Sequence, residues 1–147
     1  MAPEAILAID HNIFTPGNYF YNGVGHVTVK YEEVLAIGYE GIIAKAQKEL
    51  DECNVGDGDY AKKSRFLEAV IMSCQVLTRI VHRYAELAEQ MAYQCQDPTR
   101  KQELLQIASN CTRVPAKGAR NFYEACQSFW FVQQLIQMES SGHSISP

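Results

Sequence analysis

Two histidines stand beside glycine and serine, in segments where their side chains could act on a small ligand. His26 is in the segment GVGHVTV, whose glycines allow a ligand to approach the backbone closely. His143 and Ser144 are in the segment SGHSIS, directly after an expected helix end, where side chains are free to point into a cleft. An imidazole can donate a proton near neutral pH, and a hydroxyl can donate and accept a hydrogen bond at once. From spacing alone, both histidines are more simply ordinary loop residues.

Other residues that could do chemistry favour structural roles. A hydrolytic Ser-His-acid triad is a weak alternative, because the sequence has no G-x-S-x-G turn. His82 lies inside an expected long helix, next to its apolar seam, which predicts a partly buried structural histidine. Cys74, Cys95 and Cys126 fall on apolar helix faces, where cysteine behaves as a small hydrophobic residue. The five cysteines are an odd number without a C-x-x-C pair, so we expect reduced thiols and neither a disulfide framework nor a metal site.

Four helices are expected to position these segments. Helical periodicity runs over residues 31–50, where Gly38 and Gly41 share a face and could admit a close neighbour. A turn-rich connection at 51–59 precedes a helix over 60–96. That helix carries a heptad seam of nine residues: Leu67, Val70, Cys74, Leu77, Val81, Tyr84, Ala88, Met91 and Cys95. Its apolar stripe is widened by Phe66, Ile71, Ile80, Leu87 and Ala92, which favours a helix buried in a bundle over a free coiled coil.

The last two helices are predicted from their ends. Asp97 and Pro98 suit an N-cap and a first helical turn, and this helix should stop before Val114-Pro115. The final helix should begin near Asn121, with Glu124 answering in an arrangement like a capping box. Gly142 is expected to end it.

The expected fold class is all-α: a four-helix bundle-like arrangement over residues 31–142 after an irregular arm over residues 1–30. The arm combines glycines, prolines and aromatic residues without helical period. No run is long enough to propose a sheet, and there is no internal repeat. The whole chain is expected to form a single helical segment.

Composition excludes several classes of protein. The 147 residues are 47% hydrophobic and 20% charged, which is typical of one globular domain. A net charge of -4 without a basic run argues against a nucleic-acid partner. No apolar stretch is long enough to span a membrane, and the N-terminus does not look like a signal peptide. We therefore expect a soluble, cytoplasmic protein.

Six segments, taken together and in order, resemble one family: FTPGNYFYNGVGH, YEEVLAIGYEGII, HRYAELAEQMA, DPTRKQELLQIASNC, VPAKGARNFYEACQSFWF and ESSGHSISP. They are similar to the N-terminal half of the large glycyl radical enzymes, the group that includes pyruvate formate-lyase. Within that group, the pair GVGH and GHSIS resembles the coenzyme-B12-independent glycerol or propanediol dehydratase branch.

The resemblance implies an anaerobic dehydratase that uses a radical stored on a backbone glycine. An iron-sulfur activating enzyme that cleaves S-adenosylmethionine would install this radical, and a cysteine would pass it to a vicinal diol. By the same resemblance, His26 is the catalytic residue that contacts the departing hydroxyl. His143 and Ser144 match residues that line the diol pocket. Loss of hydroxide needs a proton donor, which an imidazole can be.

The resemblance also implies departures from the family. The glycine-radical loop and the loop with the thiyl cysteine have no counterpart in this sequence, and the family continues into the strands of a barrel beyond the position of Pro147. The chain is therefore expected to be an inactive fragment, with no cofactor bound. Alternatives are pyruvate formate-lyase proper (formate C-acetyltransferase), another glycyl radical lyase acting on choline or hydroxyproline, or a non-catalytic helical module that associates, for example with itself, through exposed apolar faces.

Overall fold

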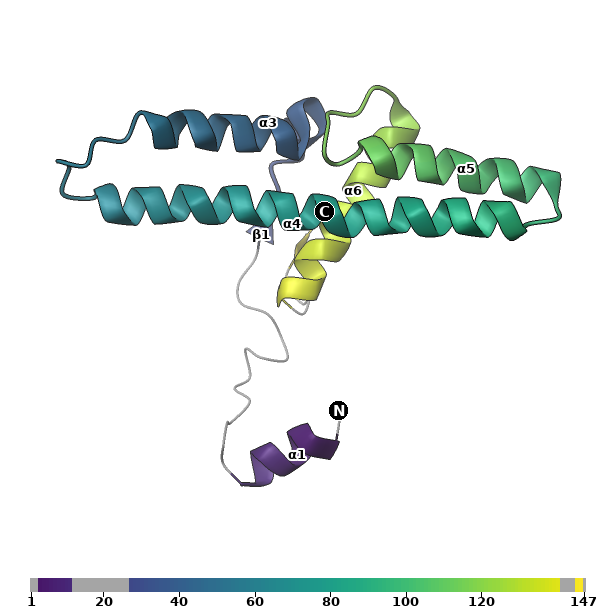
Figure 1. Cartoon of the computed structure of the whole chain (residues 1–147), viewed down its shortest axis with the longest axis horizontal. Coiled ribbons are helices and arrows are strands. Elements are labelled where there is room, and N and C mark those ends of the chain that lie inside the picture. Colours follow the sequence, from purple (N-terminus) through teal and green to yellow (C-terminus); the bar gives the residue numbers. More distant parts are fainter. Residues whose placement is uncertain (1–2, 12–26, 141–144, 147) are drawn as a thin grey trace. The chain divides into compact units, whose positions relative to one another are not determined.

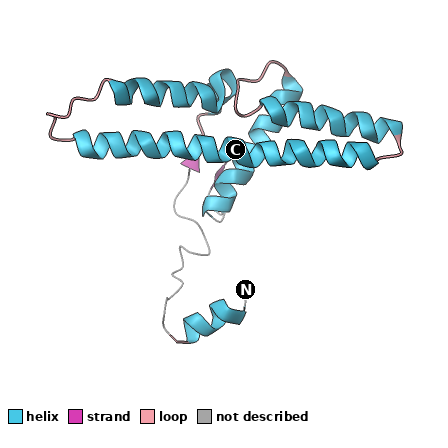
Figure 2. Ribbon diagram, in the orientation of Figure 1, coloured by secondary structure: helices cyan, strands magenta, loops and turns pink. Residues whose placement is uncertain are grey.

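The computed structural model describes residues 3–11, 27–140 and 145–146. Along the chain these residues form α1 (Pro3–Asp10), β1 (Val27–Thr28), α3 (Tyr31–Asp51), α4 (Tyr60–Gln94), α5 (Pro98–Arg113), α6 (Phe122–Ser140) and β2 (Ile145–Ser146) (Figures 1 and 2). The all-α class and the four helices after residue 30 are confirmed. Two features were not expected: α1 lies in the arm predicted to be irregular, and β1 and β2 form a two-residue ladder.

The chain divides into two compact units, residues 30–132 and residues 1–29 with 133–147. In the first unit, α3 and α5 each run antiparallel to α4, α3 beside its N-terminal half and α5 beside its C-terminal half (Figure 1). The connections Glu52–Asp59 and Cys95–Asp97 are short, which makes consecutive helices antiparallel neighbours. The turn-rich connection is therefore where the sequence predicts it.

The seam of α4 changes register halfway along the helix. Cys74, Val81 and Ala88 are buried, as predicted. The predicted seam residues Tyr84 and Met91 are 46% and 47% exposed, and Ala85 and Ala92 are buried in their place. The physical reason is size, because alanines let α5 approach α4 closely while the larger side chains turn to the edge of the contact. Of the residues expected to widen the stripe, Phe66 and Leu87 are exposed as well.

A break in α3 admits the close neighbour that the sequence predicted at Gly38. Gly38 has φ 65° and ψ −177°, a conformation that is essentially restricted to glycine. The break frees two N–H groups from the helix: Tyr39 donates to the Pro115 carbonyl (2.9 Å) and Glu40 donates to the Ala116 carbonyl (2.8 Å). At Gly41, by contrast, an added Cβ would meet Ile37 of the same helix, so this glycine admits no second element.

Gly118 completes the contact from the other side. Its neighbour Ala119 donates a backbone hydrogen bond to the Leu35 carbonyl (2.8 Å). A Cβ at Gly118 would lie 2.1 Å from the Ala36 carbonyl oxygen. The segment between α5 and α6 is therefore fixed on α3 by backbone contacts that only two glycines permit.

The predicted helix ends are largely confirmed. The Asp97 carboxylate accepts a hydrogen bond from the Thr99 N–H (2.9 Å) at the start of α5, and α5 ends at Arg113, before Val114-Pro115. At α6, Asn121 Oδ1 accepts from the Glu124 N–H (3.0 Å). Gly142, expected to end this helix, lies outside the described residues. Among the helices that the structure describes, none is long and apolar enough to cross a membrane.

Candidate functional site

The two motifs that resemble a diol site border a parallel ladder. In this ladder Val27 pairs with Ile145 and Thr28 pairs with Ser146. The sequence places His26 directly before β1, and His143 and Ser144 directly before β2. His26, His143 and Ser144 themselves lie outside the described residues. The ladder therefore joins the residues that follow the two motifs, and the predicted roles of the three side chains stay predictions.

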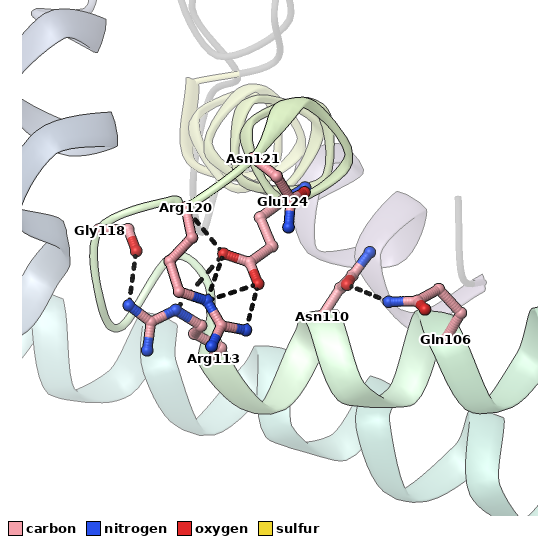
Figure 3. A network of polar contacts seen from close by, with 7 residues as sticks. All are labelled: Gln106, Asn110, Arg113, Gly118, Arg120, Asn121 and Glu124. Carbon is pink, nitrogen blue, oxygen red and sulfur yellow. Dashed lines mark hydrogen bonds and ion pairs between the residues drawn. The ribbon is translucent and has the colours of Figure 1, made fainter.

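A second polar arrangement centres on Glu124, which sequence analysis identified only as a capping residue. Its side chain is 3% exposed and lies between two arginines (Figure 3). Arg120 donates from Nη2 to Oε1 at 2.6 Å and from its backbone N–H to Oε2 at 2.8 Å. Arg113 Nε lies 3.4 Å from Oε2. In a capping box the Glu124 carboxylate would accept from the backbone N–H of Asn121. Here it accepts from the backbone N–H of Arg120, one residue earlier.

This cluster keeps a buried carboxylate ionised. Hydrogen bonding from Arg120 lowers the pKa of Glu124 below its ordinary value, against the opposing effect of burial. Arg113 also donates from Nη2 to the Gly118 carbonyl at 3.1 Å. The end of α5, the segment that contacts α3 and the start of α6 are therefore held by one charge cluster. Arg113 Nε is buried beside Oε2 without forming a hydrogen bond, and it contributes to the cluster as an ion-pair partner. Because the charged groups of the cluster face one another, its role is structural.

The Arg120–Glu124 spacing of four residues was the available sequence signal for this cluster. No helical spacing in the sequence points to Arg113, because it lies on another helix and comes close to Glu124 only when the chain is folded. A further pair on α5 is a hydrogen bond from Gln106 Nε2 to Asn110 Oδ1 (2.9 Å), which gives the amide oxygen of the buried Asn110 a donor (Figure 3).

The five cysteines are free thiols. Cys74 and Cys111 are buried, and burial raises the thiol pKa, to about 11 for Cys111. Cys74 thus behaves as the predicted small hydrophobic residue. Cys126 does not: it is exposed on α6, because the apolar face of this helix is only partly covered. Cys95 is half-buried at the end of α4.

The prediction that His82 is partly buried is wrong, because this side chain is exposed on α4. The residue of this turn that is buried in the core is its neighbour Val81, which is 1% exposed. Among the described residues, no group of three or more histidine, cysteine or acidic side chains could hold a metal ion.

An open groove of about 1400 Å³ lies between α4, α5 and α6. Its apolar side chains include Tyr84, Leu87 and Met91 of α4 and Trp130 of α6, each 46–50% exposed. Glu103 and Arg100 are the charged residues among those that line it. With no convergent set of titratable groups, the groove has the character of a packing surface.

Comparison with known proteins identifies the family. The family model described as pyruvate formate lyase-like matches residues 1–147. The chain belongs to the pyruvate formate lyase-like family. Known structures of this kind include a glycyl radical enzyme from Archaeoglobus fulgidus, at 30% identity and a TM-score of 0.74, covering 80% of this chain and 15% of that one.

Several of the similar proteins in the pyruvate formate lyase-like family are dehydratases. A structure described by 1,2-propanediol dehydration in Roseburia inulinivorans is 58% identical, with a TM-score of 0.84, over 100% of this chain and 18% of that one. The glycerol-bound B12-independent glycerol dehydratase of Clostridium butyricum is 48% identical, with a TM-score of 0.83, over 100% of this chain and 19% of that one.

A curated relative, the (2S)-3-sulfopropanediol dehydratase of Klebsiella oxytoca, is 38% identical over 94% of this chain and 17% of its own length. The chain therefore spans less than a fifth of each of these dehydratases, and it resembles the expected branch of the pyruvate formate lyase-like family.

Proposed function

We propose that this chain is part of a glycyl radical dehydratase that removes water from a vicinal diol, glycerol or propane-1,2-diol. The observation that carries the proposal is the similarity, over the whole chain, to the two dehydratase structures whose descriptions name these diols. Identity to both is higher than to the curated relative that acts on a sulfonated diol.

In this proposal His26 donates a proton to the departing hydroxyl, and His143 and Ser144 hydrogen-bond the diol. The ladder supports the pairing of the two motifs, because the N-terminal ends of parallel strands lie at the same edge. Val27, which follows one motif in the sequence, pairs with Ile145, which follows the other. A hydroxyl leaves more readily when an imidazolium protonates it.

The radical chemistry of the family needs a glycyl radical and a cysteine in contact with substrate. None of the five cysteines fits this second role: Cys74 and Cys111 are enclosed by helices, and the others lie on α6 or at helix ends. We therefore propose that a further part of a longer polypeptide supplies the radical groups. An S-adenosylmethionine-dependent iron-sulfur activating enzyme is the proposed partner, and a cytoplasmic location remains a proposal.

The decisive experiment uses the protein expressed from its whole reading frame, activated without oxygen, with aldehyde formation from glycerol and propane-1,2-diol as the assay. His26→Gln should lower kcat by about 10²–10⁴-fold, the usual contribution of a general acid. Ser144→Ala should mainly raise KM. His82→Gln is the matched control: this histidine is exposed on α4, and its variant should keep full activity. An activated enzyme that leaves both diols unchanged, or a fully active His26→Gln variant, contradicts the proposal.

The same assay separates alternative substrates. A sulfonated propanediol as the preferred substrate would assign the chain to the activity of the Klebsiella relative. Conversion of pyruvate and coenzyme A to formate and acetyl-coenzyme A would instead indicate a formate C-acetyltransferase.

The exposed apolar side chains Leu87 and Trp130 favour a second candidate function, in which the chain is a helical module that associates with copies of itself. Light scattering over a range of concentrations tests this function. A monomer at every concentration contradicts it.

A further inference from the structure

The groove between α4, α5 and α6 has the volume of a short helix. Its volume of about 1400 Å³ is close to that of a helix of about 10 Å diameter and three turns. Tyr84, Leu87 and Met91 line the α4 wall at spacings of three and four residues, and Tyr123 and Trp130 line the α6 wall seven residues apart. An amphipathic helix places apolar side chains at positions i, i+3, i+4 and i+7 into such a groove, and the side chains of these two walls repeat at the same spacings.

The polar edge of the groove carries no net charge. Its two charged residues pair with each other, because Arg100 Nη1 donates to Glu103 Oε2 at 2.7 Å. The other polar residues along the groove are mainly amides, among them Gln102, Gln106 and Gln127. A partner with charged flanks would gain nothing from this edge and would lose hydration there. The groove therefore fits a helix with an apolar face and uncharged, amide- or hydroxyl-bearing flanks.

We propose that this groove binds one amphipathic helix of the same polypeptide, from a part of it that lies beyond residues 1–147. The inference rests on the proposed function, in which the chain is part of a longer enzyme. The similar dehydratases supply the length of chain that this needs, since this chain spans only 17–19% of them. An intramolecular helix docks at high effective concentration, so it needs less apolar surface than a separate partner would, and the groove offers four half-exposed apolar side chains.

Cys126 provides a built-in probe, because it is exposed and lines the groove. Its rate of alkylation by N-ethylmaleimide, followed by peptide mass spectrometry, should be at least tenfold lower in the protein from the whole reading frame than in the 147-residue chain. Cys95 is half-buried outside the groove and serves as the control, with little change between the two proteins expected. Leu87→Glu in the longer protein should restore the rate at Cys126; this side chain is already 50% exposed, so the substitution leaves the core intact.

Three results would overturn the proposal. The first is an equal alkylation rate of Cys126 in both proteins. The second is protection of Cys126 in the 147-residue chain that grows with concentration, which would assign the groove to a second copy. The third is a reading frame that ends at Pro147. Diol turnover is measured separately, so a docked helix in an enzyme that leaves diols unchanged would contradict the proposed function alone.

Discussion

At the scale of single residues, the most constrained group in the described chain is the Glu124 carboxylate. It is buried, yet it accepts hydrogen bonds from the side chain and backbone of Arg120 and lies against Arg113. A buried charge is tolerated only when partners replace the water it loses. Here the partners come from both sides of one connection, so this side chain stabilises the segment between α5 and α6.

Glu124→Gln should lower the free energy of unfolding by about 1–3 kcal/mol, because it leaves donors of Arg113 and Arg120 without their charged acceptor. Urea unfolding followed by circular dichroism measures the loss. Glu103→Gln is the matched control, since Glu103 forms an ion pair with Arg100 on an exposed surface and such pairs contribute little. Equal unfolding free energies for the two variants would show that the buried cluster contributes no more to stability than the exposed ion pair.

Glu124 should also make the free energy of unfolding depend on pH in the acidic range. The pKa of Glu124 is lowered in the folded state, so its contribution is complete above the unfolded pKa of about 4.3 and is lost as pH falls through the lower folded value. Between about pH 5 and pH 2, the unfolding free energy of the wild type should therefore fall more steeply than that of Glu124→Gln. The variant keeps part of the dependence, because hydrogen bonds from Lys45 and Lys30 lower the pKa of Glu33 to about 2. Parallel curves for the two proteins would contradict this assignment.

At the scale of elements, the contact between α3 and the segment after α5 depends on two glycines. A Cβ at Gly38 would lie 2.5 Å from the Ala116 carbonyl oxygen, and one at Gly118 would lie 2.1 Å from the Ala36 carbonyl oxygen. These neighbours are backbone atoms, which cannot move aside without breaking the hydrogen bonds that join the two elements.

Gly38→Ala should destabilise the fold by at least about 1–3 kcal/mol, the usual cost of a backbone conformation reserved for glycine, and the close contact adds to this. Gly118→Ala should also be destabilising, for steric reasons alone. Thermal unfolding is the measurement. Gly58→Ala is the control, because a Cβ there would meet nothing within 4 Å, and it should leave the melting temperature nearly unchanged. A Gly38→Ala protein as stable as this control would show that the break in α3 is not needed.

Sequence reasoning predicted what depends on near neighbours. The four main helices follow from apolar periodicity, and the Asp97 and Asn121 caps act within three residues. The missed features depend on partners far along the chain. The ladder pairs β1 with β2, and Arg113 comes close to Glu124 only when the connection to α6 is folded.

The register of α4 changes because of its partner helix α5. The heptad pattern predicts Tyr84 and Met91 in the core, whereas in the structure they line the groove. The site residues His26, His143 and Ser144 rest on motif resemblance, which helix periodicity could not have supplied.

At the scale of the whole molecule, the part of the proposed diol site that the structure describes is the ladder of β1 and β2. Beyond the ladder, the described residues supply no further strand beside β1 and β2. A two-stranded ladder of this length is marginal in water, and small ligands bind where a pocket encloses most of their surface. The 147-residue chain should therefore fold its helices and yet bind diols weakly at best.

Thermal unfolding in the presence of glycerol tests this expectation. A site with a Kd of about 1 mM would stabilise the chain by about 1.4 kcal/mol at 10 mM glycerol and raise its melting temperature by roughly 3–5 °C. We expect a change below about 1 °C for the 147-residue chain and a clear rise for the protein from the whole reading frame. Propane-1,3-diol at the same concentration is the control for general solvent effects, because its hydroxyls are not vicinal. A rise in the short chain that only the vicinal diol produces would show that its two motifs already form a working pocket, and the enclosing groups would then have to come from these 147 residues.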